Sequence, residues 1–247
     1  MMNGLHDALH AMGPQAGHIV ELWRVFLGLC TAVFVALLAT LLWALWRAPR
    51  GGLAQPPDLS MVQHAEPGPR LAVASAVAAS VVGLLVLIAA SLFTDRALAR
   101  LPLKDAVTID VVGHQWWWTV RYIGHEPTDT FDTANEIHVP VGRPVVVRLR
   151  SDDVIHSLWV PSLAGKKDLI PGRTAVMTFQ ADRAGVYEAR CAEFCGWQHA
   201  NMALMVQAHP AAEYEAWRQR QLQPASEPGE PPARRGKLVV ESSGCGL

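Results

Sequence analysis

Two thiols, an imidazole and a thioether lie close together in one stretch of this chain. Cys191, Cys195, His199 and Met202 all fall within the segment CAEFCGWQHANM. Soft sulfur ligands beside imidazole favour copper over magnesium or calcium, which take oxygen ligands, and the thioether argues against a structural zinc site. The Cys-x-x-x-Cys spacing also differs from the Cys-x-x-Cys of thioredoxin-like redox proteins. The segment therefore predicts a copper site.

The spacing C-x-E-x-C-x-x-x-H-x-x-M resembles the binuclear copper A loop of cytochrome c oxidase subunit II. In that family a further histidine comes from an upstream segment, which residues 151–161 (SDDVIHSLWVP) resemble. Two cysteines alone would more often be a buried pair or a disulfide, and quinol oxidases share the fold without the ligands. The resemblance implies six ligands around two copper ions: Cys191 and Cys195 as bridging thiolates, His156 and Met202 on one ion, and His199 with the backbone carbonyl of Glu193 on the other.

The resemblance also gives the side chain of Glu193 a role. In the family this carboxylate reaches a magnesium or manganese ion at the boundary with subunit I. Carboxylate oxygen suits such a hard ion, whereas thiolate does not. We therefore expect a magnesium or manganese ion at the subunit I interface, in addition to copper.

A run of tryptophans forms a second motif, Gly113-His-Gln-Trp-Trp-Trp118. Without further information such a cluster is most often core or interface packing. The run resembles the family pattern G-H-Q-W followed by aromatic residues, whose first tryptophan receives the electron from cytochrome c on the outer face. The resemblance assigns that role to Trp116. Trp118 is expected to point inward, because alternate residues of a strand share a face.

Several acidic side chains are candidates for a docking face. Asp153 falls at a family position near the docking surface, and residues 167–173 loosely resemble a family segment that packs on subunit I. Asp129, Asp132 and Glu136 either add to an acidic docking face or lie in solvated loops.

Composition and hydropathy indicate a membrane protein. The chain has 247 residues, of which 51% are hydrophobic, and a formal net charge of -1, which gives no indication of nucleic-acid binding. Residues 25–46 and 71–93 carry no charge, and each exceeds the roughly 20 residues that a spanning helix requires. The positive charges flanking these runs are nearly balanced, so orientation rests on the resemblance, which places both termini and the copper domain on the outer side.

Short segments of β type follow the second apolar run. Several short strands separated by turn residues indicate a sandwich or barrel, and the family resemblance specifies a cupredoxin fold. The expected strands are 106–112, 119–122, 136–142, 144–150, 175–179, 185–190 and 203–207, with a short helix over 213–223. The expected fold is therefore a two-helix transmembrane hairpin followed by an all-β cupredoxin-like sandwich.

These features divide the chain into three parts. Residues 1–100 are expected to form an N-terminal tail and a transmembrane hairpin, with helices at about 22–47 and 70–94 and a polar loop over 48–70. Residues 103–217 are expected to form the cupredoxin copper A domain. Residues 218–247 are expected to form a Pro/Glu-rich linker and the start of an incomplete cytochrome c-like segment.

Two features depart from the family. Subunit II commonly carries a glutamate near the inner end of its second helix, associated with proton uptake, whereas here the nearest acid is Glu66. The tail 235–247 resembles the start of a fused cytochrome c domain, in which such a segment runs into the haem motif C-x-x-C-H. The chain ends two residues after Cys245, so we expect no haem c on it as given. Three interpretations remain: a truncated copy of a longer protein, a remnant left after loss of the cytochrome c domain, and a disordered tail with a stray cysteine.

The sequence thus predicts the electron-accepting subunit of a cytochrome c oxidase. Such a subunit takes electrons from cytochrome c and passes them to haem in subunit I, where oxygen is reduced to water with proton translocation. The expected partners are subunit I, subunit III, cytochrome c and the lipid bilayer, with no nucleic acid. The expected location is the bacterial cytoplasmic membrane, with the copper domain on the periplasmic side.

Other proteins with copper sites are the alternatives. A membrane nitric oxide reductase can use the same copper centre and is distinguished only by its partner subunit. A soluble nitrous oxide reductase would lack the two apolar runs. A copper-delivery protein, which belongs to a different class, needs one labile copper and no motif around Trp116.

Overall fold

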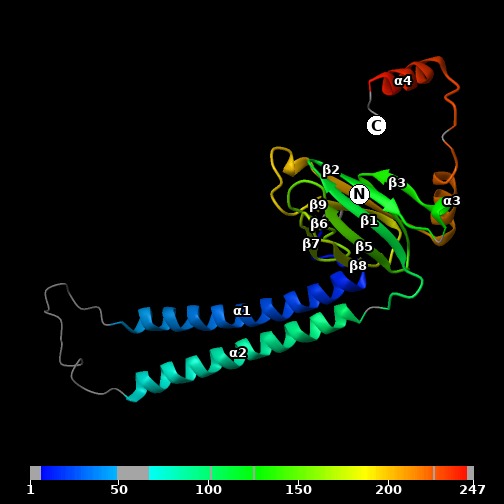
Figure 1. The fold of residues 1–247 in the computed structure, drawn as a ribbon. Coiled ribbons are helices and arrows are strands. Elements are labelled where there is room, and N and C mark those ends of the chain that lie inside the picture. The colour runs from blue at the N-terminus through cyan, green and yellow to red at the C-terminus, as the bar shows by residue number, and fades with distance from the viewer. Residues whose placement is uncertain (1–6, 49–66, 101, 125, 225, 244–247) are drawn as a thin grey trace.

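A computed structural model describes residues 7–48, 67–100, 102–124, 126–224 and 226–243. The predicted loop over 48–70 lies almost wholly outside the described residues, and so does Cys245. Within the described ranges the chain forms a long helical hairpin joined to a β-sandwich, followed by two short helices (Figure 1).

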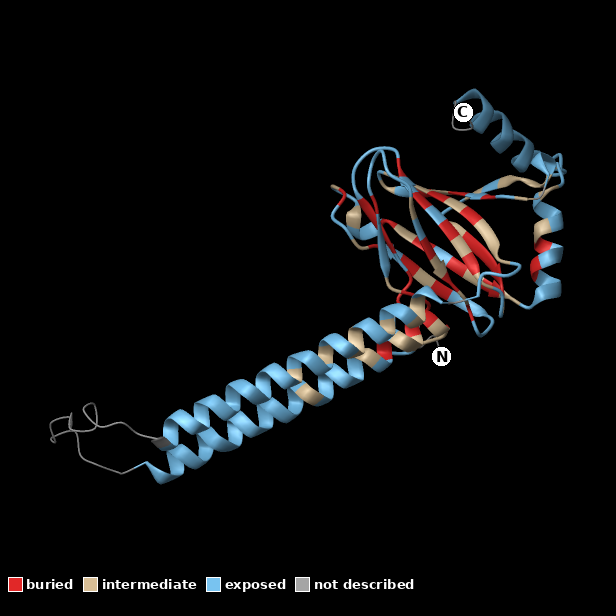
Figure 2. Ribbon diagram, turned by 60° about the horizontal axis from the view of Figure 1, so that its bottom comes forward, coloured by how far each residue is buried: buried red, intermediate tan, exposed pale blue. Residues whose placement is uncertain are grey.

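The hairpin consists of α1 (Pro14–Arg47) and α2 (Pro67–Ala99), which lie side by side (Figure 1). Both helices are long and apolar enough to cross a membrane. Their leucine, valine and phenylalanine side chains are exposed along most of the hairpin (Figure 2). An apolar surface of this extent is stable only where lipid or protein covers it, which supports the predicted spans.

Helix α1 begins earlier in the chain than predicted because its first turns pack on the sandwich. Gln15 and Val20 are buried there. The amide of Met12 donates to the carbonyl of Ser162 at 2.8 Å, and the amide of Gln180 donates to the side-chain oxygen of Gln15 at 3.2 Å. These contacts attach the hairpin directly to the β domain.

In the part of the chain that the structure describes, ten strands form two sheets that pack face to face. Their bounds are β1 Val107–His114, β2 Trp117–Tyr122, β3 Phe131–Ala134, β4 Glu136–Pro140, β5 Val145–Ser151, β6 His156–Trp159, β7 Lys166–Leu169, β8 Ala175–Phe179, β9 Gly185–Cys191 and β10 Ala203–His209. The first sheet has the order β3-β2-β1-β5-β8, and the second has the order β4-β10-β9-β6-β7. Single 3-10 turns occur at η2 (Pro127–Asp129) and η3 (His199–Asn201).

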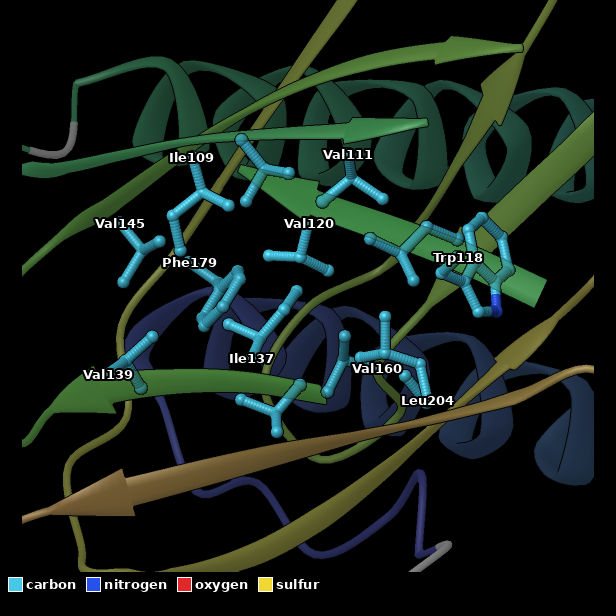
Figure 3. Close-up of a cluster of buried hydrophobic side chains, with 14 of the residues drawn as sticks. Ile109, Val111, Trp118, Val120, Ile137, Val139, Val145, Val160, Phe179 and Leu204 are labelled. Atoms are coloured by element: carbon cyan, nitrogen blue, oxygen red, sulfur yellow. The ribbon is translucent and has the colours of Figure 1, made fainter. Parts of the chain in front are cut away.

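The core lies between the two sheets. Alternate residues of β5 are buried, as expected for a strand with one face against a core. Trp118, Phe179, Ile137 and Leu204 are among the buried side chains that meet there (Figure 3). All seven predicted strands are present, and β3, β6 and β7 are additional. The expected sandwich is confirmed.

Two helices follow the sandwich. Helix α3 (Ala211–Gln221) starts shortly after β10 and packs against β4 and β10. Helix α4 (Pro231–Ser242) lies within the region predicted to be a linker and a cytochrome c-like segment, and its residues are exposed (Figure 2). Helix α4 thus covers the end of the predicted linker and most of the predicted cytochrome c-like segment, and it begins with proline at its first helical positions, as helices often do.

A pair of histidines lies where α3 meets the sandwich. The ring of Trp217 stacks on the ring of His138, with centroids 4.1 Å apart and planes 6° apart. Nδ1 of His138 and Nε2 of His209 are 2.8 Å apart, and Glu136 lies 3.5 Å from Nε2 of His138. The hydroxyl of Tyr122 accepts a bond from the His138 amide and donates one to its carbonyl. The helix is thus docked on a buried, titratable ring.

We expect the docking of α3 to weaken as the pH falls through the range just below about 6.5. Burial lowers the pKa of His138, and this outweighs the effect of Glu136, which raises it. The docked state therefore binds a proton less readily than the open state, so its stability is complete above the ordinary histidine pKa and decreases below it. Hydrogen exchange of the α3 amides, corrected for intrinsic rate and compared at pH about 7.5 and about 5.5, measures this.

The matched variant is His138→Phe, which keeps a flat ring against Trp217 and cannot titrate. Protection of α3 in this variant is expected to be independent of pH over the same range. Equal protection of α3 at both pH values in the unaltered chain would contradict the prediction.

Candidate metal centre

The candidate ligands come from two connections that meet at one end of the sandwich. His156 is the first residue of β6, and Cys191 is the last residue of β9. These two strands are neighbours, with Leu158 opposite Cys191 in an antiparallel register. This pairing explains how a histidine from an earlier connection reaches the cysteine loop.

The loop after β9 folds back through a short 3-10 turn. The amide of Met202 donates to the carbonyl of His199, and the amide of Cys191 donates to the carbonyl of Met202 at 3.0 Å. The first and last residues of the loop are therefore held together by backbone hydrogen bonds. A rigid strand pair thus supports the base of the loop.

The sulfur and nitrogen atoms of five predicted ligands converge. Sγ of Cys191 lies 3.8 Å from Nδ1 of His156 and 3.8 Å from Sγ of Cys195. Sγ of Cys195 lies 3.6 Å from Nδ1 of His199 and 3.7 Å from Sδ of Met202. Each thiol therefore faces the other thiol and one imidazole.

Glu193 contributes its backbone to this cluster and its side chain to the surface. The carbonyl oxygen of Glu193 lies 3.2 Å from Sγ of Cys191. The residue itself is exposed. The carbonyl is therefore turned toward the thiols, and the carboxylate is accessible to a partner or an ion outside the chain.

The surroundings shift the pKa values of the two thiols in opposite directions. Burial raises the pKa of Cys191, but hydrogen bonding with His156 and with backbone groups outweighs burial and lowers it. Burial raises the pKa of Cys195, and the negative charge on Cys191 raises it further. One thiolate forms readily beside the imidazole, whereas a second thiolate requires a cation to balance its charge.

The ring of His156 is held from the side opposite the thiols. Its Nε2 lies 2.7 Å from Oδ1 of Asp153, which leaves Nδ1 free to face Cys191. Asp153 also accepts hydrogen bonds from the amides of Gln115 and Val154, each at 2.6 Å. Burial raises the pKa of Asp153, but these hydrogen bonds outweigh it and lower the pKa, so the carboxylate stays ionised. A carboxylate in this position fixes the tautomer and orientation of a ligating histidine.

The tryptophan motif lies directly beside the cysteine loop. Nε1 of Trp116 donates to the carbonyl of Cys195 at 3.1 Å, and the side-chain amide of Gln115 donates to the same oxygen at 2.7 Å. Trp116 is half-buried, whereas Trp117 is more exposed and stacks on His114. Trp118 is fully buried in the core, as its strand position predicted (Figure 3). Of the three indoles, Trp116 makes the hydrogen bond to the loop.

The other acidic candidates are engaged elsewhere. Asp132 forms a two-point ion pair with Arg121, with both N–O distances 2.7 Å. Asp129 lies 3.6 Å from Arg218 of α3, and Glu136 lies beside His138. These partners place Asp129 and Glu136 near α3 and Asp132 beside β2, whereas Asp153 alone of the four is bonded to a predicted copper ligand.

The donor set fits copper. The two thiols are too far apart for a disulfide, which requires about 2.05 Å between sulfurs, and both cysteines are free. A metal–thiolate bond is about 2.3 Å long, the length known for zinc. An ion placed between Sγ of Cys191 and Sγ of Cys195, which are 3.8 Å apart, can therefore bond to both sulfurs. His156, Cys191 and Cys195 present ligand atoms within 4.8 Å of one another. Two thiols, imidazole and a buried thioether select copper by their softness.

Comparison with known proteins identifies the domain. Residues 107–209 match the family described as "Cytochrome C oxidase subunit II, periplasmic domain". The β-sandwich of this chain is therefore similar to the periplasmic domain of cytochrome c oxidase subunit II. The match begins at β1 and ends at β10, so it covers the whole sandwich and every predicted ligand.

Individual relatives agree with this assignment. A cytochrome c oxidase subunit 2 of Alkalihalophilus pseudofirmus is 39% identical over 141 residues, a match that covers 57% of this chain and 40% of that protein. A cytochrome c oxidase subunit 2 of Synechocystis is 38% identical over 113 residues, covering 46% of this chain and 32% of that protein. The match thus spans less than half the length of these curated relatives.

A solved structure is also similar. The periplasmic domain of subunit II of cytochrome oxidase from Bradyrhizobium japonicum is 28% identical, with a TM-score of 0.45, and the match covers 49% of this chain and 96% of that domain. The comparisons give no support to the interpretation of this chain as a truncated copy of a longer protein with a cytochrome c domain.

Proposed function

We propose that this chain is the electron-accepting subunit of a membrane-bound cytochrome c oxidase. It takes electrons from cytochrome c for the reduction of oxygen to water at haem in subunit I, coupled to proton translocation. The observation that carries the proposal is the convergence of Cys191, Cys195, His156, His199 and Met202 at one end of the sandwich. A family match over the same residues supports it.

The proposed ligands are the six predicted from the sequence. The bridging thiolates are Cys191 and Cys195, and the remaining ligands are His156, His199, Met202 and the backbone carbonyl of Glu193. Two thiolate-bridged copper ions supply a one-electron carrier whose charge is shared between them, so little around them rearranges on reduction. The chain contributes the buried, pre-formed cage: His156 and Met202 are at most 1% exposed.

Trp116 is proposed as the point at which the electron arrives. Its indole lies partly at the surface and donates a hydrogen bond to the carbonyl of Cys195. An aromatic ring in direct contact with the backbone of a ligand residue gives a short, bonded route from the surface to the loop. The exposure of Trp117 suits contact with a docked partner, but its ring stacks on His114.

The proposed partners are subunit I, subunit III and a c-type cytochrome, in the cytoplasmic membrane of a bacterium. The exposed carboxylate of Glu193 is the proposed ligand for magnesium or manganese at the boundary with subunit I. The apolar surface of α1 and α2 supports a position in the bilayer next to other membrane helices.

The test is purification of the full chain from its own membranes together with the subunits that accompany it. The proposal predicts a large haem-copper subunit in the preparation and oxygen consumption driven by reduced cytochrome c. Reduction of nitric oxide without oxygen consumption would instead indicate a nitric oxide reductase. A chain that purifies without a haem protein and transfers copper to an acceptor protein would indicate copper delivery and contradict the proposal.

A further inference from the structure

We propose that Gly113 is a positioning residue for the copper ligand His156. The expected effect on copper binding rests on the proposed function, whereas the steric contact between position 113 and the His156 ring does not depend on it. A Cβ atom at position 113 would lie 2.8 Å from Cδ2, 3.0 Å from Cγ and 3.3 Å from Cβ of His156. The imidazole ring therefore occupies the space that any side chain at position 113 would need.

The ring cannot make room for an added methyl group without disturbing its other contacts, because it is held on its other sides. Nε2 of His156 is bonded to Asp153 at 2.7 Å. The ring of Trp118 lies with its centroid 5.9 Å from that of His156, tilted by 60°. His156 is fully buried and Trp118 has no exposed surface, so neither side chain has open space to enter.

The sheet register places these groups together. In β1, Gly113 lies opposite Trp118 of β2 on one side and opposite Ser151 of β5 on the other. The side chain of Trp118 on β2 packs into the core, and the ring of His156 fills the space beside it where a side chain at position 113 would lie. Gly113 and Trp118 thus act as two walls of one slot for the imidazole, and Asp153 closes its end.

The need for glycine at this position comes from packing and not from backbone conformation. Gly113 is in a strand, and its φ lies outside the left-handed region that favours glycine. Gly196, in the cysteine loop, is different: its φ is +112°, and a Cβ there would lie 2.9 Å from the Gln115 side-chain nitrogen. Substitution at Gly113 therefore tests packing, and the nearest atoms that an added Cβ would meet are those of His156.

The consequence is a displaced ligand. An alanine at position 113 forces the imidazole away from its slot, which changes the 3.8 Å separation between Nδ1 and Sγ of Cys191. We expect Gly113→Ala to bind copper on the order of tenfold more weakly in competition with a chelator, the lower end of what outer-shell changes cause at metal sites. The visible and EPR spectra of the copper that remains are expected to change.

A double-mutant cycle on the metal-free full chain in detergent tests the steric claim without any dependence on copper. Gly113→Ala is expected to lower the thermal unfolding midpoint by about 4 °C or more, the shift that follows from roughly 1 kcal/mol in a domain of this size. In the His156→Ala background the same Gly113→Ala change is expected to have little effect, because the ring that it would meet is gone.

Gly165→Ala is the matched control. A Cβ at that position would lie 3.5 Å from Cδ1 of Ile19, an ordinary contact, so this variant is expected to keep the unfolding midpoint and the copper spectra. The inference is overturned if Gly113→Ala lowers the midpoint equally with and without the His156 ring, or if it leaves both midpoint and spectra unchanged. A wild-type chain that binds no copper would instead refute the proposed function, and the double-mutant cycle would still decide the role of Gly113.

Discussion

Cys191→Ser is expected to eliminate the binuclear copper centre and, with it, oxygen consumption driven by cytochrome c. A serine hydroxyl is a hard, protonated ligand that does not replace a bridging thiolate. Sγ of Cys191 lies within 3.8 Å of His156 and Cys195 and 3.2 Å of the Glu193 carbonyl, so its loss removes the group at the middle of the cluster. Metal analysis and EPR of the purified variant measure the loss, and Cys195→Ser is expected to behave in the same way.

Met202→Leu is the matched control for this experiment. Its side chain is similar in size, so the buried site keeps its packing. A thioether tunes a copper site more than it holds the ion, so this variant is expected to retain copper with a changed potential. The prediction is wrong if Cys191→Ser retains two coppers and the wild-type spectrum, or if Met202→Leu loses copper as completely as the cysteine variants.

Trp116→Ala is expected to slow electron transfer from reduced cytochrome c by orders of magnitude while the copper spectrum stays intact. The indole is proposed as a conduit, and its contact with the site is one hydrogen bond to the Cys195 carbonyl at 3.1 Å. Gln115 donates to the same oxygen, so the loop keeps a hydrogen bond there when the indole is lost. Stopped-flow oxidation of reduced cytochrome c measures the rate.

Two further variants separate the roles of the ring and of its N–H group. Trp116→Phe keeps an aromatic ring without the hydrogen bond, and Trp117→Ala removes the more exposed neighbour that stacks on His114. We expect Trp116→Phe to be intermediate and Trp117→Ala to change docking more than the transfer step. If Trp117→Ala or Trp118→Ala causes the large loss and Trp116→Ala does not, the assignment of the conduit is wrong.

Much of the fold could be predicted from the sequence because its signals are local. The two membrane helices follow from uncharged apolar runs, and the seven predicted strands follow from β-branched runs between turn residues. The strands that were missed lack those signals. β7 is rich in lysine and mostly exposed, β3 has only four residues, and β6 begins with a buried histidine and a buried serine.

Part of the candidate site could also be predicted from local sequence signals, and part depends on tertiary contacts. Four of its ligand side chains lie in one loop, and their types and spacing are visible in the sequence. The upstream histidine could be selected only by resemblance, because the pairing of β6 with β9 that brings it to Cys191 is a tertiary contact. The slot between Gly113 and Trp118 carried no sequence signal, since it depends on which strands are neighbours and on the direction in which His156 points.

The acidic candidates show why charge alone is a weak guide to a docking face. Asp153 and Asp132 look alike in the sequence, yet one is bonded to a buried imidazole and the other to a surface arginine. An exposed ion pair such as that of Asp132 contributes little to stability. The position of a carboxylate relative to the metal ligands decides its role, and that position is set by the fold.

The metal content of the purified, copper-loaded full chain tests the central claim most directly. Two copper ions per chain are predicted. Their EPR signal is expected to come from one unpaired electron shared by both nuclei. The two ions are expected to be lost together and not one at a time. One copper per chain, a signal from a single isolated copper ion, or zinc in place of copper would contradict the assignment of Cys191 and Cys195 as bridges between two ions.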